Sequence, residues 1–136
     1  MSESASGGLI AAALLSVPGA SAYFVGGTVV YTIAASRTLL AGEIVTPDGM
    51  RGATEAFARW QAESLQAKLT TTWALGETGA AGPTGNGYGD PAGHSWCAVT
   101  GPRELVHYTH TGAENREANM IAFAAAGLDL LVEALE

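Results

Sequence analysis

The stretch Thr71-Thr72-Trp73-Ala74-Leu75-Gly76 is a short run between a helical segment and a glycine-rich loop, and it indicates a buried strand. β-Branched and aromatic residues over this length are typical of a strand. Before it, residues 53–69 repeat their apolar side chains at the helical period. After the loop, residues 94–100 and 104–109 flank Gly101-Pro102, and this pattern predicts a β-hairpin.

Working outward, the same signals predict the remaining elements. These are a short buried helix over 9–16, a strand over 28–32, a helix over 34–41, loops over 42–52 and 78–93, and a helix over about 114–135. The last helix carries an apolar stripe of Met120, Ile121, Ala124, Leu128, Leu131 and Leu135. We therefore expect an α/β fold with a three-layer-like sheet of about four to five mixed parallel and antiparallel strands covered by helices.

The start of the chain indicates one domain with an unusual beginning. Residues 1–136 have the length of a single domain. The first helix follows almost directly after Ser4 or Ser6, either of which could cap it. We therefore expect no strand before that helix.

Composition excludes several classes of protein. Hydrophobic residues make up 48% of the chain and charged residues 14%, which is unlike a disordered protein. The net charge of −7 repels nucleic acid and anionic lipid, so neither is an expected partner, and any anionic ligand needs a local binding device. The single cysteine, Cys97, fits a reducing compartment. The apolar run Leu9 to Val17 is too short to span a membrane, and we expect a cytoplasmic protein.

Two glycine-bearing turns are candidate ligand sites. Glu3-Ser4-Ala5-Ser6-Gly7-Gly8 opens a helix, where backbone N–H groups bind phosphate or an oxyanion; the alternative is a helix cap with spacer glycines. Glu77-Thr78-Gly79-Ala80-Ala81-Gly82-Pro83 follows a strand, where α/β sheets bind ligands; the alternative is a plain loop. Neither turn is a complete nucleotide-binding motif.

Together these turns resemble the carboxy-terminal domain of the competence/damage-inducible CinA proteins, whose stand-alone members are nicotinamide-nucleotide (NMN) amidases. The first turn is similar to the family's Glu-Ser-Cys-Thr-Gly-Gly, and the second to its Thr-Gly-Ile-Ala-Gly-Pro. Pro18-Gly19-Ala20-Ser21-Ala22-Tyr23-Phe24, Val30-Tyr31-Thr32 and Asn115-Arg116-Glu117 also resemble family segments in the same order. The resemblance covers nearly the whole chain. It suggests a single CinA carboxy-terminal-like domain that lacks the usual leading helix and first strand.

The resemblance implies hydrolysis of a carboxamide of the nicotinamide mononucleotide type, without a metal or another cofactor. A serine nucleophile needs a base to remove its proton. In the family that base is a lysine five residues after the strand-end tyrosine, and Ser36 stands there in this chain. The only lysine, Lys68, belongs to another predicted helix. Arg37 stays protonated and cannot replace the base, but it could neutralise Tyr31 or hold a phosphate.

The candidate site combines the residues implied by the resemblance with those favoured by local chemistry. The candidate catalytic residues are Ser21, Tyr31, Ser36 and Ser4. The candidate substrate-binding residues are Ser6, Gly7, Gly8, Arg37, Thr78, Gly79, Gly82, Tyr88, His94 and Arg116. Among these, Tyr88 could stack on a pyridine ring, and His94 is the best substitute base.

Five other titratable side chains lie outside this list. Glu3 and Glu77 adjoin the two turns, and either could act as a base if burial raised its pKa. Cys97 in an apolar strand is interpreted as a core residue. His107 and His110 point to opposite faces of a strand and make a poor metal pair.

Three functions remain open from the sequence. The chain could be an NMN-type amidase with an altered base, a repurposed small-molecule enzyme, or a non-catalytic binding or assembly module. The expected missing strand would leave a sheet position unpaired, which a second copy could cover. We therefore expect a homo-oligomer that binds a pyridine-nucleotide-like small molecule.

Overall fold

The computed structural model describes residues 1–136 and contains one five-stranded sheet in the order β2-β1-β3-β4-β5. The strands are β1 (Ser2–Glu3), β2 (Thr28–Val29), β3 (Ala74–Ala80), β4 (His94–Thr100) and β5 (Leu105–His110). β1 pairs in parallel with β2 and β3, whereas β3, β4 and β5 are antiparallel. The predicted mixed sheet and the predicted hairpin are therefore confirmed.

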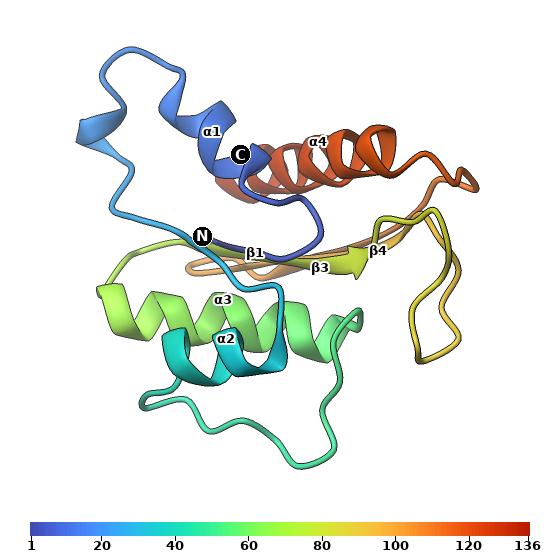
Figure 1. Ribbon diagram of the computed structural model, residues 1–136. Coiled ribbons are helices and arrows are strands. Elements are labelled where there is room, and N and C mark those ends of the chain that lie inside the picture. The colour runs from blue at the N-terminus through green and yellow to red at the C-terminus, as the bar shows by residue number, and fades with distance from the viewer.

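Helices cover both faces of the sheet, which makes three layers (Figure 1). The helices are α1 (Leu9–Leu15), α2 (Ile33–Leu39), α3 (Glu55–Leu69) and α4 (Arg116–Leu135), with a 3₁₀ turn at Ala20–Ala22. α1 and α4 lie on one face, and α2 and α3 lie on the other (Figure 1). All four predicted helices are confirmed to within a few residues of their ends. One core lies on each side, around Ile10, Leu75 and Phe123 on the first face and around Trp60 and Leu65 on the second.

The expectation that no strand precedes the first helix is wrong. β1 is only two residues long, yet it lies between β2 and β3, with Ser2 opposite both Thr28 and Gly76. Its side chains are polar but fully buried, and the Ser2 hydroxyl donates to Gln61 Oε1 at 2.8 Å. A polar dipeptide carries no strand pattern, so only the pairing on both sides reveals it. The sheet therefore has no empty position between β2 and β3 for a second copy of the chain to cover.

The strand predicted over 71–76 begins and ends later than expected. β3 runs to Ala80, so the start of the predicted loop is a paired strand, with Gly79 opposite Ser95. Gly79 serves close packing, because a Cβ atom there would lie 2.4 Å from the His94 carbonyl oxygen. The strand predicted over 28–32 is in contrast reduced to Thr28–Val29.

α4 is the longest helix and faces the sheet through small side chains as well as large ones. Its buried residues include Phe123, Gly127 and Leu130, whereas Ile121 and Leu135 of the predicted stripe are exposed. By length and composition alone α4 could cross a membrane, with a mean hydropathy of 1.6, but the core helix of a soluble protein has the same properties. α4 packs on β4, β5 and α1, and 33% of its most apolar window is buried inside the structure.

Candidate functional site

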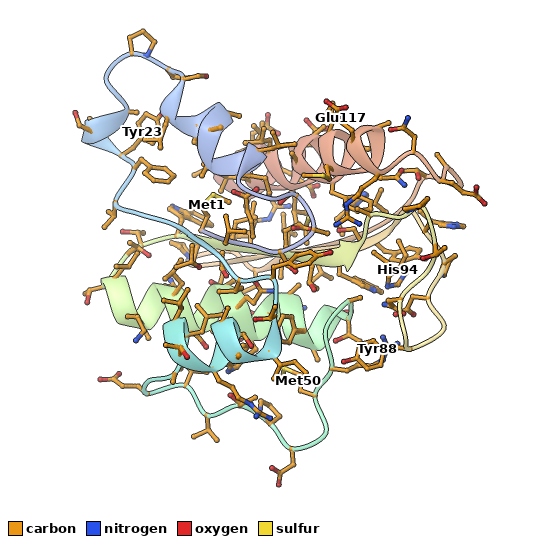
Figure 2. All side chains as sticks on the ribbon, viewed as in Figure 1. Met1, Tyr23, Met50, Tyr88, His94 and Glu117 are labelled. Carbon is orange, nitrogen blue, oxygen red and sulfur yellow. The ribbon has the colours of Figure 1, made fainter.

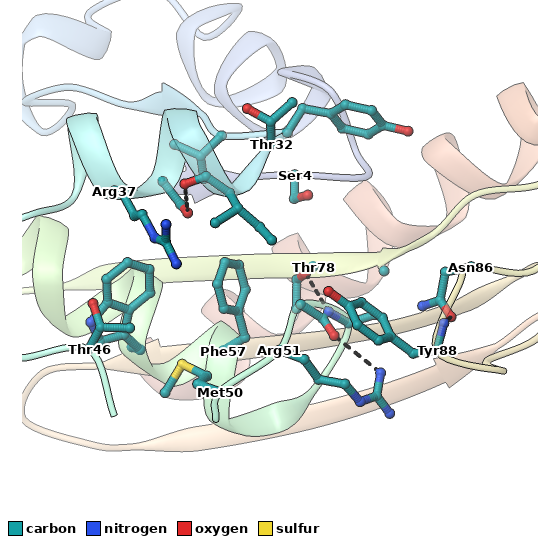
Figure 3. Close-up of a pocket in the computed structure, with 18 residues that line it drawn as sticks. Ser4, Thr32, Arg37, Thr46, Met50, Arg51, Phe57, Thr78, Asn86 and Tyr88 are labelled. Carbon is teal, nitrogen blue, oxygen red and sulfur yellow. Dashed lines mark hydrogen bonds between the residues drawn. The ribbon is translucent and has the colours of Figure 1, made fainter. Parts of the chain in front are cut away.

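A cavity lies where three parallel strands end. Ser4 follows β1, Tyr31 follows β2, and Thr78 lies near the carboxyl end of β3; all three line a cavity of about 330 Å³. Parallel strands bring their carboxyl ends to one edge of the sheet, and this edge is where α/β folds bind ligands. α2, the segment before α3 and the loop after β3 complete its walls (Figure 3).

Ser4 is positioned by a buried carboxyl group on the neighbouring strand. Glu77 Oε2 accepts from the backbone N–H groups of Ser4 (3.0 Å) and Ser6 (2.9 Å), and Oε1 accepts from the Ser95 hydroxyl at 3.1 Å. The Ser6 hydroxyl lies 2.8 Å from Glu77 Oε2 and 2.6 Å from Glu3 Oε1. Glu77 therefore fixes the chain that presents Ser4 to the cavity.

Glu3 and Glu77 are buried supports, and neither lines the cavity. The Ser6 hydroxyl has one proton for two carboxyl groups, so the second contact needs a proton on a carboxyl. Burial raises the pKa of Glu77, and the hydrogen bonds from Ser6, Ser4 and Ser95 partly oppose that rise. Such a carboxyl group stabilises the loop but does not reach a ligand.

The first glycine turn does not form an anion site at the start of α1. The cap position is Gly8 in the left-handed conformation, and no serine caps the helix. The Glu3 carboxylate accepts instead from the N–H groups of Ile10 (2.9 Å) and Ala11 (3.0 Å), so the helix N-terminus already holds an anion. Gly7, also at positive φ, is packed against Met120. Ser6, Gly7 and Gly8 line no part of the cavity.

Tyr31 is held at the cavity by an arginine from α4. Arg116 Nη2 donates to the Tyr31 phenolic oxygen at 2.7 Å, and Nη1 donates to the Gly82 carbonyl oxygen at 2.6 Å. The guanidinium also lies 5.9 Å from the centre of the Tyr31 ring. Arg116 and Gly82 thus lie outside the cavity lining and position Tyr31. The Tyr31 O–H remains free to donate a hydrogen bond.

Ser36 and Arg37 have opposite environments on α2. Ser36 is buried, and its hydroxyl donates to the Ile33 carbonyl oxygen at 2.9 Å. Arg37 lines the cavity and points its guanidinium inward, toward the side of Phe57 (Figure 3). Ser36 is therefore occupied by its own helix, and Arg37 presents the charge on this wall.

The outer wall is a loop fastened by an ion pair. Arg51 Nη1 lies 2.5 Å from Asp90 Oδ2, and its guanidinium lies 4.9 Å from the centre of the Tyr88 ring. Asn86 donates to the same carboxylate oxygen at 2.8 Å and accepts from the backbone N–H groups of Tyr88 and Asp90. The Arg51 guanidinium holds the pKa of Asp90 below its usual range. Tyr88 thereby lines the cavity in a fixed place (Figure 3).

His94 is not a cavity residue, and both of its ring nitrogens are engaged. Nε2 lies 2.7 Å from the Ala53 carbonyl oxygen, so it carries the proton, and Nδ1 accepts from the Tyr108 hydroxyl at 3.1 Å. Ala53 has a left-handed φ of 57°, and its N–H donates to Thr78 Oγ1 at 3.0 Å. His94 therefore secures a strained residue of the wall, and the expectation that it approaches the site as a base is wrong.

The chain is similar to proteins of a known family. A family model described as the CinA C-terminal domain matches residues 1–135. The chain belongs to the CinA family. A CinA-like protein of Salinibacter ruber is 35% identical over 127 residues, covering 93% of this chain and 31% of that protein. A CinA-like protein of Acidobacterium capsulatum is 37% identical over 127 residues, covering 90% and 30%. The chain thus spans about a third of the length of these curated CinA relatives.

Solved CinA structures have the same fold. The competence/damage inducible protein CihA from Agrobacterium tumefaciens superposes with a TM-score of 0.85 at 29% identity, covering 99% of this chain and 83% of that one. The competence damage-inducible protein A (ComA) from Klebsiella pneumoniae gives 0.88 at 26% identity, covering 98% and 83%. The family resemblance inferred from the motifs is therefore confirmed.

One serine implied by the CinA resemblance lies outside the cavity. Ser21 is exposed on the 3₁₀ turn that lies with α1 on one face of the sheet (Figure 1). Its neighbour Tyr23 is on that face, whereas Tyr88 and Met50 are on the face covered by α2 and α3 (Figure 2). Ser21 makes no hydrogen bond within the chain and does not line the cavity.

Seven of the predicted site residues of this CinA chain line one cavity: Ser4, Tyr31, Ser36, Arg37, Thr78, Gly79 and Tyr88. Sequence reasoning missed several other lining residues, namely Thr32, Thr46, Met50, Arg51, Phe57, Trp60 and Asn86. Trp60 is notable because its buried Nε1–H has no hydrogen-bond partner. The predicted core position of Cys97 is confirmed, and burial raises the pKa of its thiol.

Proposed function

We propose that this CinA-family chain binds a small carboxamide of the nicotinamide mononucleotide type in the cavity and hydrolyses its amide. The observation that supports this proposal is the meeting of Ser4, Tyr31 and Thr78, which come from three separate family-like segments. Phe57 and Tyr88 supply aromatic surface for a flat ring. We propose that the protein acts in the cytoplasm.

The proposed reaction uses a serine hydroxyl and needs no metal. The serine oxygen adds to the amide carbonyl, ammonia leaves with a proton, and water then cleaves the acyl-serine to give the carboxylate. Ser4 is the lining serine whose hydroxyl makes no hydrogen bond within the chain, and the free O–H of Tyr31 can donate to the carbonyl oxygen. No Lys, His, Asp or Glu lines the cavity, so we expect turnover about 10²–10⁴-fold below that of an amidase with a built-in base.

Ammonia release from nicotinamide mononucleotide, measured at high enzyme concentration, tests this function. We expect slow release that falls by at least about tenfold in Ser4→Ala and in Tyr31→Phe. Ser16→Ala is the matched control, because Ser16 is exposed at the end of α1 and bonds only to Ala13. Absence of ammonia, or equal rates in Ser4→Ala and Ser16→Ala, would contradict the proposed chemistry.

A second candidate function is binding without catalysis. Two observations favour it: the cavity has no base of ordinary kind, and the Ser36 hydroxyl is bonded to its own helix. Tight binding of the mononucleotide with no ammonia released over long incubation would support this candidate over hydrolysis.

We also propose that the chain forms a homo-oligomer through the surface around α1 and β2. Several large apolar side chains are exposed there, including Leu15, Val17, Tyr23, Val25 and Val29. Such a patch is typical of an interaction site. Light scattering at micromolar concentration should give a mass that is a multiple of 13.8 kDa. A monodisperse monomer would contradict the proposal.

This surface also carries Ser21, so the oligomer would offer Ser21 a route to another copy's cavity. Ser21→Ala and Tyr31→Phe subunits can be mixed to test this route. Ammonia release that exceeds the sum of the separate variants would support a shared site. Additive rates would restrict the reaction to residues of one chain.

A further inference from the structure

The cavity has a charge opposite to that of the protein. The chain carries thirteen Asp and Glu against six Lys and Arg. Yet none of the eighteen lining residues is acidic, and two of them, Arg37 and Arg51, are cationic. A concave surface with one sign of charge concentrates ligands of the other sign. The cavity therefore favours anions although the molecule as a whole repels them.

Arg37 is distinguished from every other basic side chain by having no partner. The other five are all engaged: Arg51 with Asp90, Arg59 with Glu55, Arg103 with Glu133, Lys68 with the Ala41 carbonyl oxygen, and Arg116 with Tyr31 and the Gly82 carbonyl oxygen. The Arg37 side chain makes no hydrogen bond or ion pair and still faces the cavity (Figure 3). Its five N–H donors are thus free for a ligand.

We propose that Arg37 is the anchor for an oxyanion, a phosphate or a carboxylate group, on the small molecule that this cavity binds. This inference deepens the proposed function, on which the choice of nucleotide probes rests. A planar guanidinium binds such groups through two parallel hydrogen bonds. Arg51 is already neutralised by Asp90, so it forms a wall and does not compete for the oxyanion.

The arrangement also sets the orientation of the ligand. Arg37 comes from α2 at one end of the cavity, and Tyr88 with Asn86 comes from the loop at the other, with Phe57 between them (Figure 3). A ligand that places its oxyanion on Arg37 therefore directs the rest of its length toward Phe57 and Tyr88. Molecules with both an anionic group and a flat ring are selected over those with either alone.

Calorimetric titration with matched ligands tests the anchor. Nicotinamide mononucleotide and nicotinamide riboside share the carboxamide ring and differ in the phosphate. We expect the mononucleotide to bind roughly ten- to a hundredfold more tightly, and Arg37→Met to remove most of that difference. Ribose 5-phosphate and inorganic phosphate, titrated separately, show whether the phosphate binds without the ring.

Arg103→Met is the matched control, because it removes the same charge from an exposed position that lies outside the cavity. Equal affinity of the two nicotinamide ligands, or equal losses in Arg37→Met and Arg103→Met, would overturn the anchor. The test of the anchor and the test of hydrolysis can fail independently of each other. Binding that depends on Arg37 without ammonia release supports the anchor and contradicts hydrolysis, whereas ammonia release unchanged in Arg37→Met does the reverse.

Discussion

Replacement of Glu77 by alanine is expected to lower the free energy of unfolding by about 3–5 kcal/mol. The carboxyl group is fully buried, and its removal leaves the N–H groups of Ser4 and Ser6 without acceptors. Buried donors without partners carry the full cost of desolvation. Denaturant unfolding followed by circular dichroism measures the change.

Two further variants serve as controls for Glu77→Ala. Glu104→Ala removes an exposed carboxylate and should change stability by less than about 0.5 kcal/mol. Glu77→Gln keeps an acceptor and the shape of the side chain, so it should cost less than alanine. A stability of Glu77→Ala close to that of Glu104→Ala would refute the structural role of Glu77.

The pH dependence of the same pair is also informative. Burial raises the pKa of Glu77 above its ordinary value of 4.5, so the folded state binds a proton that the unfolded state releases. The stability due to this proton is present below pH 4.5 and is lost as pH rises through the folded-state pKa. The natural chain should therefore lose stability relative to Glu77→Gln as pH rises from 4.5.

Gly76→Ala is expected to destabilise the fold by about 3 kcal/mol, because α3 crosses β3 at this point with no room for a side chain. A Cβ atom on Gly76 would lie 2.1 Å from the Ala58 carbonyl oxygen and 2.9 Å from the Ala62 nitrogen. Both atoms belong to the backbone of α3, so a rotamer change cannot relieve the overlap. The helix would have to move away from the sheet.

Gly87→Ala is the control for this overlap. Nothing lies within 4 Å of a Cβ atom there, and its φ is not in the left-handed region. Its effect should stay within about 0.5 kcal/mol. Equal unfolding midpoints for Gly76→Ala and Gly87→Ala would show that the two elements do not pack this closely.

Much of the fold could be predicted because the apolar residues of most elements repeat at the period of a helix or of a strand. The helix at Glu55–Leu69 and the hairpin of β4 and β5 follow directly from apolar spacing and turn residues. β1 could not be predicted, because Ser2 and Glu3 are polar and owe their burial to hydrogen bonds with other segments. The buried face of α4 differs from the predicted stripe for a related reason, since it includes Asn119, Gly127 and Ala134, which are not large apolar residues.

The candidate site divides in the same way. Ser4, Tyr31 and Thr78 were found from motifs, and their meeting at one sheet edge follows from parallel pairing. Arg51 and Asn86 could not be found, because both are placed by hydrogen bonds to Asp90, which is 39 residues from Arg51 and four residues from Asn86 within an irregular loop. Neither loop has a period or motif that reports such contacts. The proposed anchor role of Arg37 likewise depends on the absence of a neighbouring acid, which only coordinates reveal.

The Arg51–Asp90 fastening has a consequence for how this family can diversify. The outer wall of the cavity belongs to a surface loop, and this loop contributes few residues to the hydrophobic core. Substitutions in that loop can reshape what fits against Tyr88 at small cost to folding. New ligand preferences can therefore arise by substitution within this one exposed loop, while the sheet and its helices stay unchanged.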